Sequence, residues 1–149
     1  MDAPTTDIAL IAHSIQLSLA PVFLLSGIGV LLGVLTNRLA RIVDRARPLE
    51  ERLQHADTAT ATQLHSQLRT FARRARLMNA SITLGVISAL LIASVVALLF
   101  SSAFVHFNLA AAVSGLFIAA MFSLVLALGS FLAEIRIATA TLRIGHSHH

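Results

Sequence analysis

The chain has 149 residues, of which 56% are apolar and only 12% are charged. So few polar side chains cannot cover a soluble globule of this size, so the composition excludes an ordinary soluble domain and indicates a membrane protein. The absence of cysteine excludes disulfides and thiol chemistry. The net charge of +4 comes from arginine alone, and the chain has no tyrosine or tryptophan, which argues against nucleic acid as a partner.

The N-terminal segment is predicted to be retained and to form an amphipathic helix over residues 5–19. Ile8, Ile11 and Ile15 fall on one face of such a helix. Asp2 stands where a signal peptide would carry positive charge. We therefore expect this helix to lie on the outer face of the membrane.

The first membrane span is predicted over residues 21–37. A single helix from Ile8 to Leu35 would be roughly 42 Å long, against a hydrocarbon core of about 30 Å. Because proline is well tolerated in the first turn of a helix, Pro21 is the expected start of the span. One long tilted helix that is kinked at Pro21 is the alternative.

Residues 38–78 are predicted to form an antiparallel helical hairpin, because two runs of apolar residues step by three and four as heptad seams do. A polar break at residues 54–62 supplies the turn, and Pro48 is expected to kink the outgoing helix. The seam residues are Leu35, Leu39, Ile42, Ala46, Leu49 and Leu53 in the first run, and Leu64, Leu68, Phe71, Ala75 and Met78 in the second.

The second and third spans are predicted over residues 79–101 and 109–133, followed by a tail over 134–149. Both spans carry small residues at four-residue intervals, which permits close approach of helices in lipid. Such a repeat drifts by about 40° per step and favours a right-handed crossing. Three helices that each carry a face of small residues offer more such faces than packing within one subunit needs, so we expect a homo-oligomer. The candidate helix-packing residues are Gly29, Gly33, Ser81, Gly85, Ala89, Ala93, Gly115, Ala119 and Ser123.

The arginines predict the orientation in the membrane. Nine of the eleven fall between Arg38 and Arg76, so the positive-inside bias makes the hairpin cytoplasmic. The N-terminus and the link at residues 101–108 are then outside, and the C-terminal tail is cytoplasmic. Polar residues at the inner ends of the spans are candidates for a pore mouth or for contacts with lipid phosphate. They are Asn37, Arg38, Arg41, Arg45, Arg73, Arg74, Arg76 and Asn79.

Other polar residues offer little chemistry. Glu134 is expected to pair with Arg136 or with an arginine at the base of the hairpin, and a proton or cation site is the alternative. His13 and His106 fall on the outer side, where a metal site or a pH sensor is the less favoured interpretation. The histidines of the tail at 145–149 resemble a metal-binding segment, a tag remnant or a disordered end. No catalytic constellation can be assembled, so we expect no enzyme activity, no cofactor and no metal.

Two segments carry a family resemblance. Residues 18–47 read SLAPVFLLSGIGVLLGVLTNRLARIVDRAR, and residues 73–82 read RRARLMNASI. The chain resembles the DUF2721 family of small bacterial inner-membrane proteins, a domain of unknown function, over most of its length. The most specific positions are residues 36–41 together with Arg76, Leu77 and Asn79. The resemblance implies a bacterial inner-membrane location and marks the base of the hairpin as the defining site, but it implies no reaction.

Two functional classes remain open. The first, slightly favoured, is a homo-oligomeric pore for ions or small solutes, with serine and threonine hydroxyls along the path and the basic hairpin as gate or lining. The second is a membrane-anchored scaffold, whose coiled-coil hairpin binds a cytoplasmic protein or anionic phospholipid. The absence of a charged or polar ring at mid-membrane depth counts against the pore.

Overall fold

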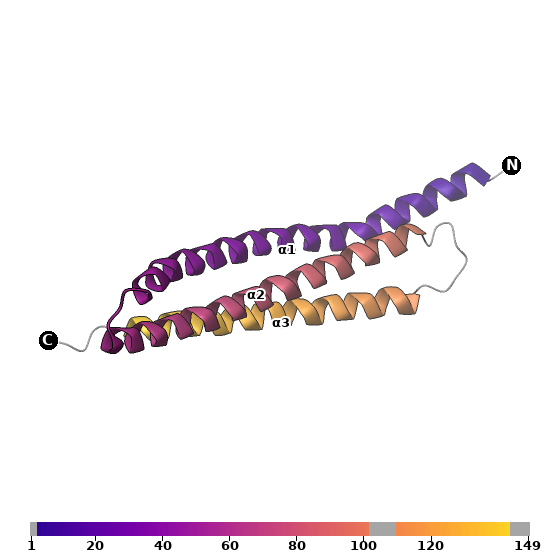
Figure 1. Cartoon of the computed structure of the whole chain (residues 1–149). Coiled ribbons are helices and arrows are strands. Elements are labelled where there is room, and N and C mark those ends of the chain that lie inside the picture. Colours follow the sequence, from indigo (N-terminus) through magenta and orange to yellow (C-terminus); the bar gives the residue numbers. More distant parts are fainter. Residues whose placement is uncertain (1–2, 102–109, 144–149) are drawn as a thin grey trace. The chain divides into compact units, whose positions relative to one another are not determined.

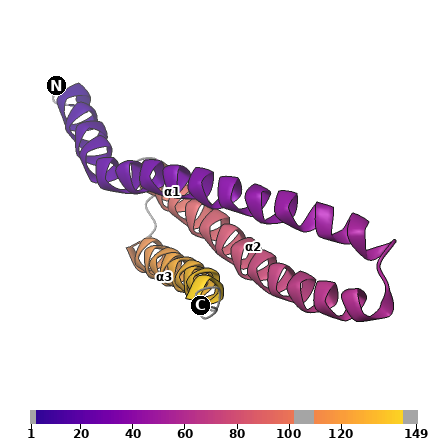
Figure 2. The ribbon, with the colours of Figure 1, turned by 90° about the vertical axis from the view of Figure 1, so that its left-hand side faces the viewer.

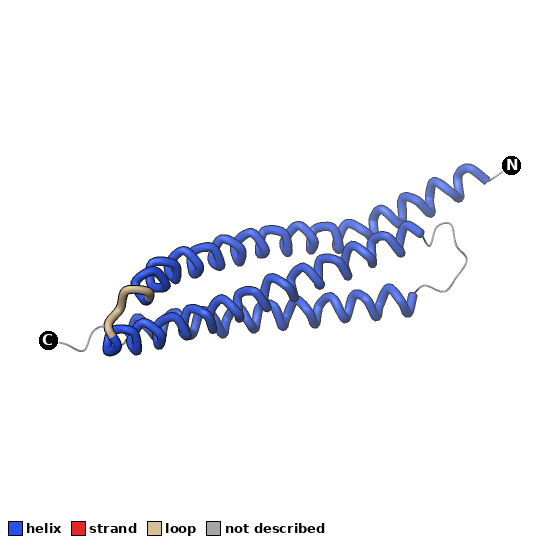
Figure 3. Tube along the Cα trace, in the orientation of Figure 1, coloured by secondary structure: helices blue, strands red, loops and turns tan. Residues whose placement is uncertain are grey.

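A computed structural model describes residues 3–101 and 110–143 of the chain, and nearly all of them are helical. The three helices are α1 (Ala3–Leu53), α2 (Thr58–Ser101) and α3 (Ala110–Arg143), as Figure 1 shows. Of the described residues 97% are in helices and none is in a strand, and the short stretch between α1 and α2 is drawn as loop in Figure 3. The predicted all-α fold class is thereby confirmed.

All three helices are long and apolar enough to cross a membrane. The candidate spans are Ile11–Leu53, Thr58–Ser101 and Ala110–Thr139, with mean hydropathies of 2.2, 2.7 and 2.4 over their most apolar stretches. Only about a fifth of each stretch, 17–22%, is buried within the chain. Apolar side chains that stay uncovered in such numbers are typical of lipid-facing helices. These observations support a multi-pass membrane protein.

The helix α1 is continuous, which differs from the predicted division at Pro21. Both Pro21 and Pro48 lie inside it, and no separate helix over residues 5–19 is seen. Figure 2 shows the indigo N-terminal part of α1 bending away from the part that follows, as the alternative of one kinked helix predicts. Proline removes one hydrogen bond from the helix ladder, and long apolar helices accommodate this loss by local adjustment. The predicted position of residues 5–19 at the membrane surface stays a prediction.

The chain divides into two compact units. The first unit comprises Met1–Leu31 and Leu84–Val125, and the second comprises Leu32–Thr83 and Leu126–His149. In the first unit several large apolar side chains point outward, since Phe23 is 74% exposed and Ile118 is 68% exposed. Small or polar side chains such as Ser88 and Ala120 are instead fully buried. This distribution suits a helix bundle in lipid, where the outside is apolar and close contacts need small residues.

In the second unit, α1 and α2 are joined by residues 54–57, a shorter break than the predicted 54–62 (Figure 2). Asp57 directly precedes α2, and its carboxylate accepts a hydrogen bond of 2.9 Å from the backbone N–H of Thr58, the first residue of the helix. The backbone carbonyls of Arg52 and Leu53 accept turn hydrogen bonds from residues 55 and 56. Every residue of the two predicted heptad seams is buried or half-buried. In addition, α3 continues as a helix to Arg143, well into the predicted tail.

Burial along α2 does not follow the predicted four-residue repeat. The buried positions alternate in steps of three and four, whereas the predicted face also included Ala93, which is exposed. Steps of three and four keep one stripe facing its neighbours, while a strict step of four turns steadily away from them. The predicted four-residue repeat therefore does not describe burial along α2 within this chain, and the right-handed crossing stays a prediction. The buried residues of α2 from Met78 onward are Met78, Ser81, Gly85, Ser88, Ile92 and Val95.

Candidate functional site

A fully buried carboxylate, that of Glu134 on α3, joins the three helices of the second unit. Its Oε2 accepts a hydrogen bond of 3.0 Å from the guanidinium of Arg38 on α1. Its Oε1 lies 2.9 Å from Nε of Arg74 on α2 and 2.9 Å from a terminal nitrogen of the same guanidinium. The Glu134 side chain is 0% exposed, while those of Arg38 and Arg74 are 36% and 16% exposed. The predicted pairing of Glu134 with an arginine of the hairpin base is confirmed, and its partners are Arg38 and Arg74 instead of Arg136.

Two aromatic rings help to orient these arginines. The guanidinium carbon of Arg38 lies 5.2 Å from the centre of the Phe131 ring, one turn before Glu134 on α3. That of Arg74 lies 5.9 Å from the ring of Phe71, on its own helix. Arginine over an aromatic face gains a modest cation–π attraction, and its planar group stacks well. Charged hydrogen bonds and ring contacts together hold the two guanidinium groups in defined positions.

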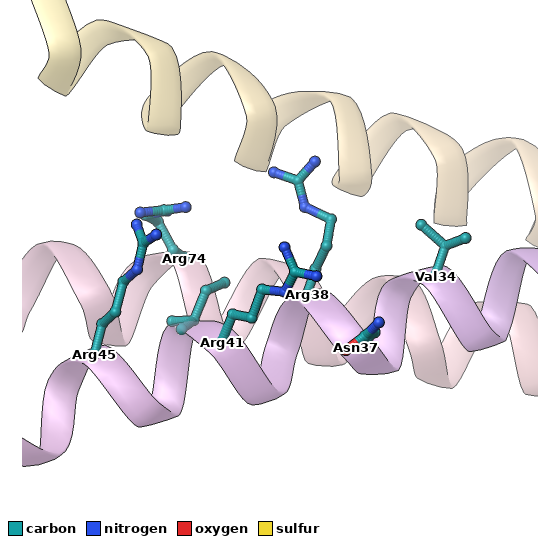
Figure 4. A pocket seen from close by; sticks show the side chains of 7 residues that line it. Val34, Asn37, Arg38, Arg41, Arg45 and Arg74 are labelled. Carbon is teal, nitrogen blue, oxygen red and sulfur yellow. The ribbon is translucent and has the colours of Figure 1, made fainter.

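Glu134, Arg38 and Arg74 together form an ion cluster. Beside this ion cluster lies a cleft with a volume of about 440 Å³, which we call the arginine cleft. Figure 4 shows the side chains of Arg38, Arg41 and Arg45 extending from α1 toward one side, with Arg74 reaching in from α2. Arg41 and Arg45 make no ion pair or hydrogen bond with any residue that the structure describes. The residues that line the cleft are Val34, Asn37, Arg38, Arg41, Ile42, Arg45 and Arg74.

The arginine cleft contains only part of the predicted inner-end set. Asn37, Arg38, Arg41, Arg45 and Arg74 line it. The remaining three candidates, from the returning helix α2, are exposed and do not line it. They are Arg73, Arg76 and Asn79. Consecutive residues of a helix are rotated by about 100°, so Arg74 points into the cleft and its neighbours Arg73 and Arg76 do not.

The predicted helix-packing residues divide into two groups. Ser81, Gly85 and Ser123 are buried and Ala89 is half-buried. The other five are exposed, and a methyl group added at any of the three glycines among them would meet nothing within 4 Å in the chain. They are Gly29, Gly33, Ala93, Gly115 and Ala119. Their part in association between subunits stays a prediction.

A reciprocal pair of hydrogen bonds connects α2 and α3 in the first unit. The hydroxyl of Ser88 donates to the backbone carbonyl of Ala120, and the hydroxyl of Ser123 donates to the carbonyl of Leu84, both at 2.8 Å. In lipid such bonds are useful because no water competes for the donors. Ser123 was a sequence candidate, but Ser88 was missed. Its position seven residues after Ser81 is the heptad signal that could have identified it.

A second groove, with a volume of about 470 Å³, lies between α1 and α2 toward their shared turn. Its lining is partly apolar and includes Ile42, Leu68 and Phe71. Arg47 and Glu50 from α1 also line it. Its mixed charge distinguishes it from the arginine cleft, whose lining side chains include four cations and no acidic group.

The chemistry available at the arginine cleft is the binding of anions. Guanidinium groups match phosphate and carboxylate oxygens with paired hydrogen bonds, and arginine is weakly hydrated compared with lysine. Among the described residues no group of three or more histidine or acidic side chains is arranged for a metal ion. His13 is exposed, while His106 and the histidines at 146–149 lie outside the described residues.

Comparison with known protein families shows a match over most of the chain. A family model described as "Protein of unknown function (DUF2721)" matches residues 18–144. Neither the curated proteins nor the solved structures contain a significant match. The matched region includes all the residues of the ion cluster and of the arginine cleft.

Proposed function

The chain belongs to the DUF2721 family, whose function is unknown, and from its arginine cleft we propose that it is a bacterial inner-membrane protein that binds phosphate groups of anionic phospholipids. The single observation that carries this proposal is the juxtaposition of four guanidinium groups in one cleft where, within residues 3–101 and 110–143, only the carboxylate of Glu134 is bonded to any of them. Two positive charges, those of Arg41 and Arg45, remain without an internal counter-ion among the described residues. Basic pockets of this kind between membrane helices suit lipid headgroups on the cytoplasmic side.

In this proposal the arginine cleft faces the cytoplasmic leaflet. The N-terminus is outside, the hairpin at residues 38–78 and the C-terminus are cytoplasmic, and the first N-terminal turns lie at the outer surface. The positive-inside bias supports this orientation, because the arginines directly follow the first apolar stretch and directly precede the second. The protein acts as a membrane-anchored module without catalytic chemistry.

The test is lipid binding by the purified protein in detergent, measured by native mass spectrometry during titration with phosphatidylglycerol. We expect the protein to bind phosphatidylglycerol and not the zwitterionic phosphatidylcholine. Replacing both Arg41 and Arg45 by Gln should weaken binding roughly 30-fold, since each basic side chain near a headgroup contributes about 1 kcal/mol. Both side chains are exposed, so the substitutions leave the fold intact.

The matched control removes the same charge elsewhere. Arg52 and Arg136 are also exposed and do not line the arginine cleft. Replacing this pair by Gln should leave the affinity for phosphatidylglycerol close to that of the unaltered protein. Equal losses in the two double variants would show that binding reflects overall charge and would contradict a defined site.

A second candidate function is a homo-oligomeric pore, which the exposed small residues favour. Gly29, Gly33 and Gly115 have open space where a side chain would project, although small residues in membrane helices usually mark close contacts. In such an assembly Arg38 and Arg41 would lie at the inner mouth and set the preference for anions.

The pore requires more than one copy, so native mass measurement decides first. We expect an oligomer whose mass falls toward that of one chain when Gly33 and Gly115 are replaced by Leu, because the larger side chains separate the helices. Liposomes that contain the oligomer should then show ion flux that changes when Arg38 and Arg41 are replaced by Gln. A single chain as the only species, or electrically silent bilayers, would contradict the pore.

A further inference from the structure

The arginine cleft carries more positive charge than one phosphodiester can neutralise. Four guanidinium groups line it, and among the described residues Glu134 alone supplies a bonded negative charge, which is shared between Arg38 and Arg74. Three positive charges therefore remain. A phosphatidylglycerol headgroup carries one negative charge and would leave two of the three unneutralised at a surface that loses water on binding, which is unfavourable.

The cleft is also elongated along α1. Arg38, Arg41 and Arg45 follow each other over seven residues, which at 1.5 Å per residue is about 10 Å along the helix axis. Figure 4 shows their side chains distributed along this length on one side of the helix. The volume of about 440 Å³ falls within the usual range for sites that hold small organic ligands. A ligand with two anionic groups can engage donors along this row without the arginine side chains having to converge on one point.

The walls of the cleft point to a lipid as the source of the phosphates. Val34 lies at one end, is 49% exposed and belongs to the apolar stretch that precedes Arg38. Asn37 adds a neutral hydrogen-bonding group next to it. A ligand with phosphates toward Arg41 and Arg45 and an apolar portion toward Val34 would satisfy both kinds of surface. This is the arrangement of a phospholipid in the leaflet.

We propose that the arginine cleft is a site for a phospholipid headgroup with two phosphate groups, such as cardiolipin. This inference rests on the proposed function and specifies its ligand class. Two phosphodiesters held by one headgroup bind as linked ligands, so the second contact forms at high effective concentration. The Glu134 carboxylate does not compete with the ligand in this arrangement. It fixes Arg38 and Arg74 in place through one terminal nitrogen of Arg38 and one edge of Arg74, and leaves their remaining donors for phosphate.

The experiment compares cardiolipin with phosphatidylglycerol at equal total phosphate, by native mass spectrometry of the full chain in detergent. We expect cardiolipin to bind at least about tenfold more tightly per phosphate, as linked binding predicts. The R41Q/R45Q double variant should lose this preference, so that the two lipids bind equally per phosphate. The R52Q/R136Q control should retain the full preference.

The outcomes separate this inference from the proposed function. If the unaltered protein binds both lipids equally per phosphate, the two-phosphate site is overturned while binding of anionic lipid stands. If it binds neither lipid, the proposed function itself fails. Inorganic phosphate and pyrophosphate are added as soluble competitors. If pyrophosphate displaces cardiolipin at comparable concentration, the claim that the bound phosphates belong to a lipid is overturned. If pyrophosphate fails to displace cardiolipin, that claim is supported.

Discussion

Replacing Glu134 by Ala is expected to lower the free energy of unfolding by about 3 kcal/mol, the lower end of the range for breaking a buried ion pair. The carboxylate is fully buried and bonded to Arg38 and Arg74 from two other helices. Without it, two guanidinium groups repel each other at the junction of three helices, and Arg74, only 16% exposed, loses its counter-ion. The lower end of the range applies because Arg38 is 36% exposed and can be hydrated.

The measurement is an unfolding titration of the purified protein with a denaturing detergent, followed by circular dichroism. Asp44→Ala is the matched control, because Asp44 is exposed and its substitution also removes one negative charge, here from α1. Glu134→Gln should lie between the two, since an amide retains an acceptor for one arginine but no charge. Equal midpoints for Glu134→Ala and Asp44→Ala would contradict the structural role of the ion cluster.

Replacing Ser88 by Leu is expected to destabilise the first unit by about 2–3 kcal/mol. Ser88 is 0% exposed and donates a hydrogen bond of 2.8 Å to Ala120 on α3. Leucine would remove the bond and add a net two heavy atoms at a point where the two backbones are close, so the helices must separate. Ser88→Ala removes only the bond, and its cost should be about 0.6 kcal/mol, the average for hydrogen bonds between membrane helices.

The control for this prediction is Ser94→Leu on the same helix. Ser94 is exposed, and its hydroxyl donates to the carbonyl of Leu90 within α2. A leucine there extends into lipid and should leave the unfolding midpoint nearly unchanged or raise it slightly. If Ser88→Leu and Ser94→Leu shift the midpoint equally, the close contact between α2 and α3 is not formed in the protein.

Much of the fold could be predicted from the sequence, because helix formation in lipid depends on local properties. Three long apolar stretches predict three spanning helices, since every backbone group must be satisfied within its own segment. The heptad positions of the hairpin, such as Ile42 and Leu64, were predicted from spacing alone and are buried. The continuity of α1 through Pro21 was predicted only as the alternative, because a proline in the sequence does not indicate whether the helix ends there or continues with a bend.

The candidate site could be predicted only in outline. The sequence placed Arg38, Arg74 and Glu134 near the inner ends of three spans, and so near one another. It could not distinguish Arg74 from Arg73 and Arg76, which differ only in their rotation about the helix axis. Nor could it identify Ser88, whose side chain is one of several hydroxyls in the second span and matters because a carbonyl of α3 lies opposite.

The sequence by itself thus indicated the membrane environment, the number of helices and the clustering of positive charge, because hydropathy and charge are sums over neighbouring residues. The tertiary structure alone decided which side chains meet. Glu134 is sixty residues from Arg74 and ninety-six from Arg38, yet all three meet because α3 packs against both other helices in the second unit. Contacts over such separations depend on the rotation and register of each helix, and a shift of one residue turns a side chain by about 100°.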